Sequence, residues 1–111
     1  MAKVVLDGKE HTLKLDFNAI CSFEQITGKS FIVFSNQLQK EGPLSMAFSD
    51  MRALLWAGLL NEGEKITLED VGNAINLNDK NVLTDITTGI AAAIAEAFPK
   101  GEATDKKKEE N

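Results

Sequence analysis

The sequence predicts a single α+β domain, mainly α-helical, in which an N-terminal β-hairpin packs on a bundle of four to five helices. Two patterns support this fold class: apolar residues alternate with polar ones as far as Phe17, and beyond it they recur every three or four residues. With 111 residues, 43% of them hydrophobic and 26% charged, the chain has the size and composition of one globular domain. We expect that domain to cover residues 1–99.

The hairpin is expected over residues 3–17, where alternate side chains are apolar and would line one buried face. Asp7-Gly8 lies between the two apolar runs. This dipeptide favours a tight turn because glycine adopts a positive φ without steric cost. The sequence therefore predicts two short antiparallel strands joined at Asp7-Gly8.

Capping and stop signals divide the following residues into helices. The first expected helix spans 17–27, capped by Asp16 or Asn18 and closed by Gly28, and the second spans about 31–39, capped by Ser30 and stopped by Gly42-Pro43. A third helix is expected over 45–61. A fourth spans about 68–75 and starts with a capping box of Thr67 and Asp70, and a last helix starts near Asp79 and ends at Pro99.

Residues 100–111 contain eight charged side chains and no large apolar one. Such a segment cannot bury enough apolar surface to offset the entropy lost on ordering. We therefore expect a disordered tail at 100–111.

The segment 45–61 is the most apolar part of the chain and shows two apolar stripes when projected as a helix. Such a helix is either central in the fold or partly covered by a partner. The second stripe holds Trp56 and Leu60 at i, i+4 spacing, and tryptophan is enriched in binding hot spots. The candidate partner-binding residues are Met46, Ala53, Trp56 and Leu60. The alternative for Trp56 and Leu60 is that the hairpin or the second helix covers them.

Glu24 falls within the apolar arc of the first helix. A carboxylate in that position needs a hydrogen-bond or ion-pair partner, because an uncompensated buried charge is costly. Arg52, on the third helix, and the backbone amides near Gly28 are the two candidates. We treat Glu24 and Arg52 as structural polar residues.

The inventory for catalysis is sparse, with one histidine, one cysteine and no tyrosine. His11 is expected to be a solvated strand residue and Cys21 a small hydrophobe in the core. Gly28-Lys29-Ser30 matches the last three residues of a phosphate-binding loop motif, but Phe23 occupies the position where that motif requires its first glycine. We expect no catalytic residue, no cofactor and no metal site, and hence no enzyme.

The formal net charge of −5 argues against nucleic acid as a partner, because binding to phosphates needs clustered Lys and Arg. No apolar run reaches the roughly 18–20 residues that a membrane helix needs. A single cysteine suits a reducing compartment, which favours the cytoplasm.

Four segments of the sequence resemble those of a known family. These segments are 15–20 with Phe23-Glu24, 27–30, 52–59 and 66–72. Together they resemble the phage and gene-transfer-agent tail assembly chaperone family over roughly residues 10–75. The resemblance implies a chaperone that binds the tape measure protein and helps to recruit tail tube protein while a long tail is built. It further implies that the protein is not retained in the mature virion. From the exposed apolar stripes we also expect a homo-oligomer, located in the host cytoplasm.

Two other functions are compatible with the same residues. One is a structural virion component, such as a tail tube or connector subunit, because small phage proteins of mixed α and β content fill these roles. The other is a small enzyme or ligand-binding domain with an unrecognised pocket, which would require a deep polar pocket.

Overall fold

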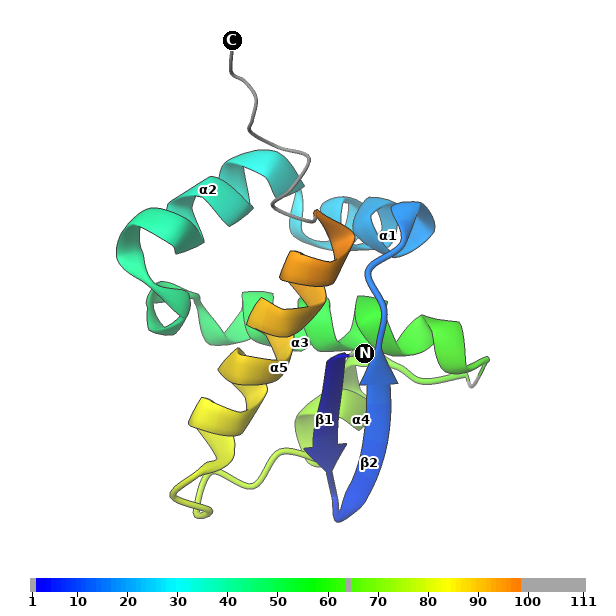
Figure 1. Cartoon of the computed structure of the whole chain (residues 1–111). Helices are drawn as coiled ribbons and strands as arrows, with labels where there is room; N and C mark the ends of the chain where they lie inside the picture. Colours follow the sequence, from blue (N-terminus) through cyan, green and yellow to red (C-terminus); the bar gives the residue numbers. More distant parts are fainter. Residues whose placement is uncertain (1, 64, 99–111) are drawn as a thin grey trace, which may run out of the picture.

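The computed structural model describes residues 2–63 and 65–98, in which a two-stranded hairpin packs against five α-helices (Figure 1). The strands are β1 (Ala2–Leu6) and β2 (Lys9–Leu13), and the helices are α1 (Phe17–Thr27), α2 (Phe31–Glu41), α3 (Phe48–Leu59), α4 (Leu68–Asn73) and α5 (Val82–Ala97). Two single-turn 3-10 helices flank α3: η1 (Pro43–Ser45) and η2 (Leu60–Glu62). The predicted fold class, mainly α with an N-terminal hairpin, is confirmed. The tail predicted at 100–111 and the stop at Pro99 lie outside the described residues.

The hairpin closes through a two-residue turn at the predicted dipeptide. Asp7 and Gly8 have φ angles of 54° and 77°, as a type I′ turn requires. Leu6 consequently pairs with Lys9, and the register continues to Ala2 opposite Leu13. Because side chains alternate along a strand, Ala2, Val4 and Leu6 of β1 lie on one buried face, whereas Val5 is on the exposed face.

Local capping fixes the ends of the shorter helices. Asp16 Oδ1 accepts a hydrogen bond from the amide of Ala19 at 2.9 Å, which starts α1, and Gly28 ends the helix in the left-handed conformation. Thr67 and Asp70 form the predicted capping box at α4, with both hydrogen bonds at 3.0 Å. These starts match the predicted positions.

The helix expected over 45–61 is shorter in the structure. Gly42, with a φ of 93°, and Pro43 start the separate turn η1, and the backbone is extended at Met46, so α3 begins only at Phe48. At the other end the chain tightens into η2, which Gly63 closes at a φ of 79°. The prediction was wrong about the ends of this helix because apolar periodicity continues across both tight turns.

The last two helices are also shorter than predicted, and side chains bind the backbone of the segment between them. Asn76 Oδ1 accepts from the amide of Asn78, and Asp79 Oδ1 accepts from the amide of Asn81, each at 3.0 Å. Such local hydrogen bonds compete with helix formation. Helix α4 ends earlier, at Asn73, where the amides of Ala74 and Ile75 donate to carbonyls three residues back, and α5 starts only at Val82.

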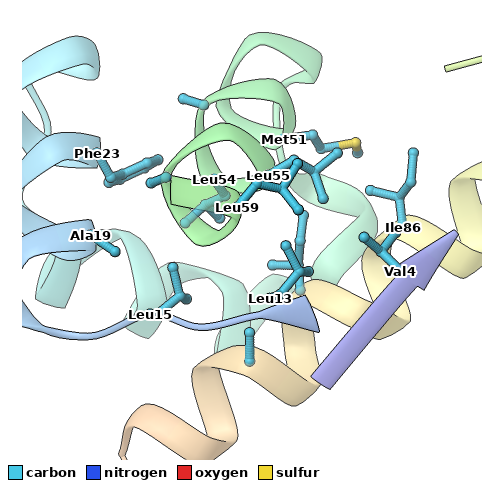
Figure 2. Packing of buried hydrophobic residues seen from close by; sticks show 14 of the residues in the cluster. Val4, Leu13, Leu15, Ala19, Phe23, Met51, Leu54, Leu55, Leu59 and Ile86 are labelled. Carbon is cyan, nitrogen blue, oxygen red and sulfur yellow. The ribbon is translucent and has the colours of Figure 1, made fainter. Parts of the chain in front are cut away.

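Helix α3 occupies the centre of the fold. It contacts α1, α4, α5 and β2, and side chains from the hairpin and α1 point toward its core residues in Figure 2. Eight of its twelve residues are buried, among them Leu54, Leu55 and Leu59. The sequence left two explanations for the two apolar stripes, a central position or cover by a partner. The central position explains most of the helix.

The hairpin reaches the two long helices by close backbone approach at two glycines. A Cβ on Gly58 of α3 would lie 2.9 Å from Leu13 Cδ2, and a Cβ on Gly89 of α5 would lie 2.8 Å from the Lys3 carbonyl oxygen. The amide of Lys14 also donates to the Gly58 carbonyl at 3.1 Å. Strand β2 therefore lies directly against α3 and β1 directly against α5. A side chain at either glycine would force the strand and the helix apart.

We expect Gly89→Ala to lower the free energy of unfolding by about 1–3 kcal/mol, because the new methyl group meets a backbone oxygen that cannot move independently. Gly58→Ala should cost less, because the nearest atom, Leu13 Cδ2, is the end of a flexible side chain, whereas the preference of helices for alanine applies at both positions. Urea denaturation of both variants measures the difference. Equal stability of Gly89→Ala and the unmodified protein would contradict this account of the packing.

Candidate functional site

His11 is part of a polar cluster that joins the hairpin to the end of α3. Its Nδ1 lies 2.8 Å from Glu62 Oε1, and Glu62 Oε2 accepts from the amide of Thr12 at 2.9 Å. Asn61 Nδ2 donates to the Thr12 carbonyl at 3.1 Å and also to the carbonyl of Gly58. The His11 side chain is only 15% exposed, which corrects the expectation of a solvated residue. The cluster fastens β2 to η2.

Two opposing effects act on the Glu62 carboxyl. Burial alone would raise its pKa, but the hydrogen bonds from His11 and the Thr12 amide, together with the nearby charges of His11 and Lys9, lower the pKa by more. The folded protein therefore holds Glu62 in its ionised form more strongly than the unfolded chain does. No histidine–nucleophile pair results, because the partner of His11 is a carboxylate with a structural role.

Glu24 is bound through a backbone amide. Its Oε2 accepts from the amide of Phe31, the first residue of α2, at 2.8 Å. Of the two partners considered from the sequence, a backbone amide just beyond Gly28 is the one that the structure shows. Arg52 lies elsewhere, with its side chain over Gly72 of α4. Glu24 thus joins the end of α1 to the start of α2.

Sequence reasoning missed a second carboxylate, on α3. This residue is Asp50, which is only 5% exposed. The ammonium of Lys29 donates to Asp50 Oδ2 at 2.6 Å, and Asp50 lies in the first turn of the helix, where the dipole favours negative charge. The ion pair between Lys29 and Asp50 therefore holds the loop between α1 and α2 against α3.

The four candidate partner-binding residues do not share one open surface. Met46 and Ala53 are 6% and 3% exposed, so both are part of the core in this structure. Trp56 and Leu60 are half-buried. The indole Nε1 of Trp56 donates to the Ile66 carbonyl at 2.9 Å, so the segment before α4 lies against this side chain, whereas the hairpin or α2 had been considered. A partner role for Trp56 and Leu60 stays a prediction for their exposed parts.

Large apolar side chains are exposed at other positions on the molecule. The described residues in this group are Val5, Phe17, Ile26, Ile32, Val33, Leu44, Phe48, Leu77 and Phe98. Two of them, Ile32 and Phe98, line a surface groove of about 600 Å³ between α2 and α5. Phe48 and Leu77 line a smaller hollow of about 310 Å³ beside α3 and α5. We call the larger of these the α2/α5 groove.

Neither a metal centre nor a membrane helix emerges from the described part of the chain. Within residues 2–63 and 65–98, no three His, Cys, Asp or Glu side chains gather closely enough to hold a metal ion. Among the same residues, no helix has the length and apolar character needed to cross a bilayer.

The family model described as phage tail tube protein, GTA-gp10, matches residues 1–100. The chain belongs to this family. Comparison with curated proteins and with solved structures gave no match. The protein is therefore related to the tails of phages or gene-transfer agents.

The family match corrects two expectations drawn from the resemblance. A tail assembly chaperone that binds the tape measure protein was expected, but the matching family is described as a tail tube protein. The expected absence from the mature virion is overturned by the same finding, because a tube protein is a component of the particle. The quoted segments identified the tail system correctly but assigned the wrong role within it.

Protonation of Glu62 should weaken the link between β2 and η2. Because the folded-state pKa is below its ordinary value of 4.5, the contribution of Glu62 to stability is complete above that pH and is lost as the pH falls below it. We therefore expect Glu62→Gln to destabilise the protein at neutral pH and to differ less from the unmodified protein in acid. Urea denaturation at a series of pH values tests this, and a difference independent of pH would contradict it.

Trp56→Phe should lower the free energy of unfolding by about 1 kcal/mol, because the Ile66 carbonyl loses its indole donor. Trp56→Ala should cost more, since it also removes the aromatic ring from the interior. Far-ultraviolet circular dichroism during urea denaturation measures both variants, which lack the only tryptophan of the chain. If Trp56→Phe matched the unmodified protein, the hydrogen bond to Ile66 would have no part in stability.

Proposed function

We propose that this chain is a structural subunit of a phage-type tail tube. The observation that carries the proposal is the match of the tail tube family over residues 1–100. This coverage includes every described helix and strand, so it concerns the whole fold and not one motif. The role is non-enzymatic, because a tube subunit acts through its contacts with neighbouring proteins.

The surface of the fold supports a role in assembly. Nine large hydrophobic side chains are exposed among the described residues, and four of them line the two hollows beside α5. Contiguous apolar surface on a soluble protein commonly marks a site of protein association. A subunit that is surrounded by other subunits would bury such surface on assembly.

The partners that we propose are other copies of this chain and neighbouring tail components. The net charge of −5 does not favour a nucleic-acid partner. Direct binding to the tape measure protein, which the resemblance implied, stays a separate prediction.

Quantitative mass spectrometry of purified particles tests the proposal. We expect the protein in the mature particle, in many copies that scale with the length of the tail, because a tube repeats its subunit. Tailless particles from the same lysate provide the matched control and should lack it. Presence in the lysate but absence from finished particles would overturn the proposal, and a small fixed copy number would indicate a connector subunit.

A further inference from the structure

The central helix α3 reaches the surface at Arg52. From Asp50 to Leu59 every other residue is buried, apart from the half-buried Trp56, whereas Arg52 is exposed. Arg52 is also the only arginine of the chain. An otherwise enclosed helix therefore presents one cationic side chain to solvent.

The guanidinium of Arg52 has no hydrogen-bond or ion-pair partner within residues 2–63 and 65–98. Its stem lies across α4 at Gly72, where no side chain is in the way. A Cβ on Gly72 would lie 3.5 Å from Arg52 Cδ and 4.0 Å from Nη1. Packing on α4 restricts the stem, so less entropy is lost when the guanidinium binds a ligand. Arg52 is thus held in place without being neutralised.

Two hollows adjoin at Arg52. Arg52 and Ser49 line both the hollow of about 310 Å³ beside α3 and α5 and a second hollow of about 250 Å³ beside α1, α3 and α4. All other residues that line the first hollow are apolar or glycine. Phe48 and Leu77 are exposed at the first hollow, and Ile26 at the second. We call the surface formed by the two hollows the Arg52 surface.

The charge of the Arg52 surface is opposite in sign to that of the whole chain, which is −5. The charged residues that line the two hollows are Lys29, Asp50 and Arg52. The Lys29 ammonium donates to Asp50 Oδ2 at 2.6 Å, so these two charges offset each other and Arg52 supplies the net charge. One free cation suits one carboxylate, whereas a nucleic-acid backbone needs several clustered cations.

We propose that the Arg52 surface binds a segment of a neighbouring tail protein in which one Asp or Glu lies between large apolar side chains. This inference rests on the proposed tube function and adds the chemistry by which one neighbour is recognised. Arginine binds a carboxylate through two parallel hydrogen bonds, and the hollow at Phe48 and Leu77 accepts apolar side chains. Arginine is also enriched among the residues that contribute most to interface energies.

A second copy of this chain does not offer such a segment in its described part. Among residues 2–63 and 65–98, no Asp or Glu has a large exposed apolar residue within four positions on both sides. The acids next to exposed apolar residues are also engaged locally. Asp16 caps α1 beside Phe17, and Glu24 binds the Phe31 amide close to Ile26. The occupant that fits is therefore a different protein.

A zero-length cross-link identifies the carboxylate that meets position 52. Carbodiimide couples a lysine amine, but not a guanidinium, to a carboxylate in direct contact, so the test uses particles and producing-cell lysates that carry the full chain with Arg52→Lys. We expect the new amine to be joined to an Asp or Glu of another tail protein, with a large apolar residue within four positions on each side. Thr88→Lys is the matched control, because Thr88 is exposed on α5 and lines neither hollow. This control should not give the product.

Charge reversal measures what this contact contributes to assembly. Arg52→Glu should leave the urea midpoint of the isolated chain unchanged, because the guanidinium has no partner in the described part of the chain. The yield of complete tails should fall by about tenfold or more, as expected for the loss of one strong interface contact. Replacing the cross-linked carboxylate of the partner by arginine should restore the yield, which a folding defect would not allow.

The proposal would be overturned by a cross-link confined to this chain or its copies, by no cross-link, or by a linked carboxylate without apolar neighbours. The same product from Thr88→Lys, or an unchanged tail yield with Arg52→Glu, would also overturn it. Protein that is abundant in particles but gives no cross-link at position 52 would refute the Arg52 surface alone. A cross-link to a tail protein in the lysate, with none of the chain in finished particles, would refute the tube function alone.

Discussion

The arrangement of the fold depends on how closely the hairpin can approach α3 and α5. Gly58 and Gly89 leave no side chain between these helices and the strands, so Leu13 and Val4 pack directly against helix backbone. Helix α3 is surrounded by α1, α4, α5 and β2. The contact between the hairpin and the two helices therefore also determines which apolar surfaces of the fold stay exposed to solvent. The outer side of α5, opposite the hairpin, is left to form one wall of the α2/α5 groove.

Features determined by neighbouring residues could be predicted from the sequence. The turn at Asp7-Gly8 and the helix starts at Asp16 and Thr67 each depend on a hydrogen bond or a φ angle within about four residues. The ends of α3 could not be predicted in this way, because apolar periodicity runs on through η1 and η2. Those ends depend on where Gly42 and Gly63 redirect the chain.

The site residues show the same division between local and distant effects. Two stripes on α3 were visible in the sequence, but which one would be covered depends on the segment around Ile66, ten residues away from Trp56. Glu62 and Thr12 lie fifty positions apart, and no local pattern links them. The burial of Asp50 could not be predicted either, because the sequence does not reveal that Lys29 reaches it. The family was likewise identified only by a comparison that spans residues 1–100, because the quoted segments are structural and carry no chemistry.

The cluster of His11, Asn61 and Glu62 has a consequence for the outer edge of β2. A strand at the border of a sheet normally offers free amides and carbonyls to which another chain can add as a further strand. Here the amide and the carbonyl of Thr12 are both occupied by side chains, and the amide of Lys14 is bound to α3. The addition of a further strand at Thr12 is therefore blocked on this side of the hairpin.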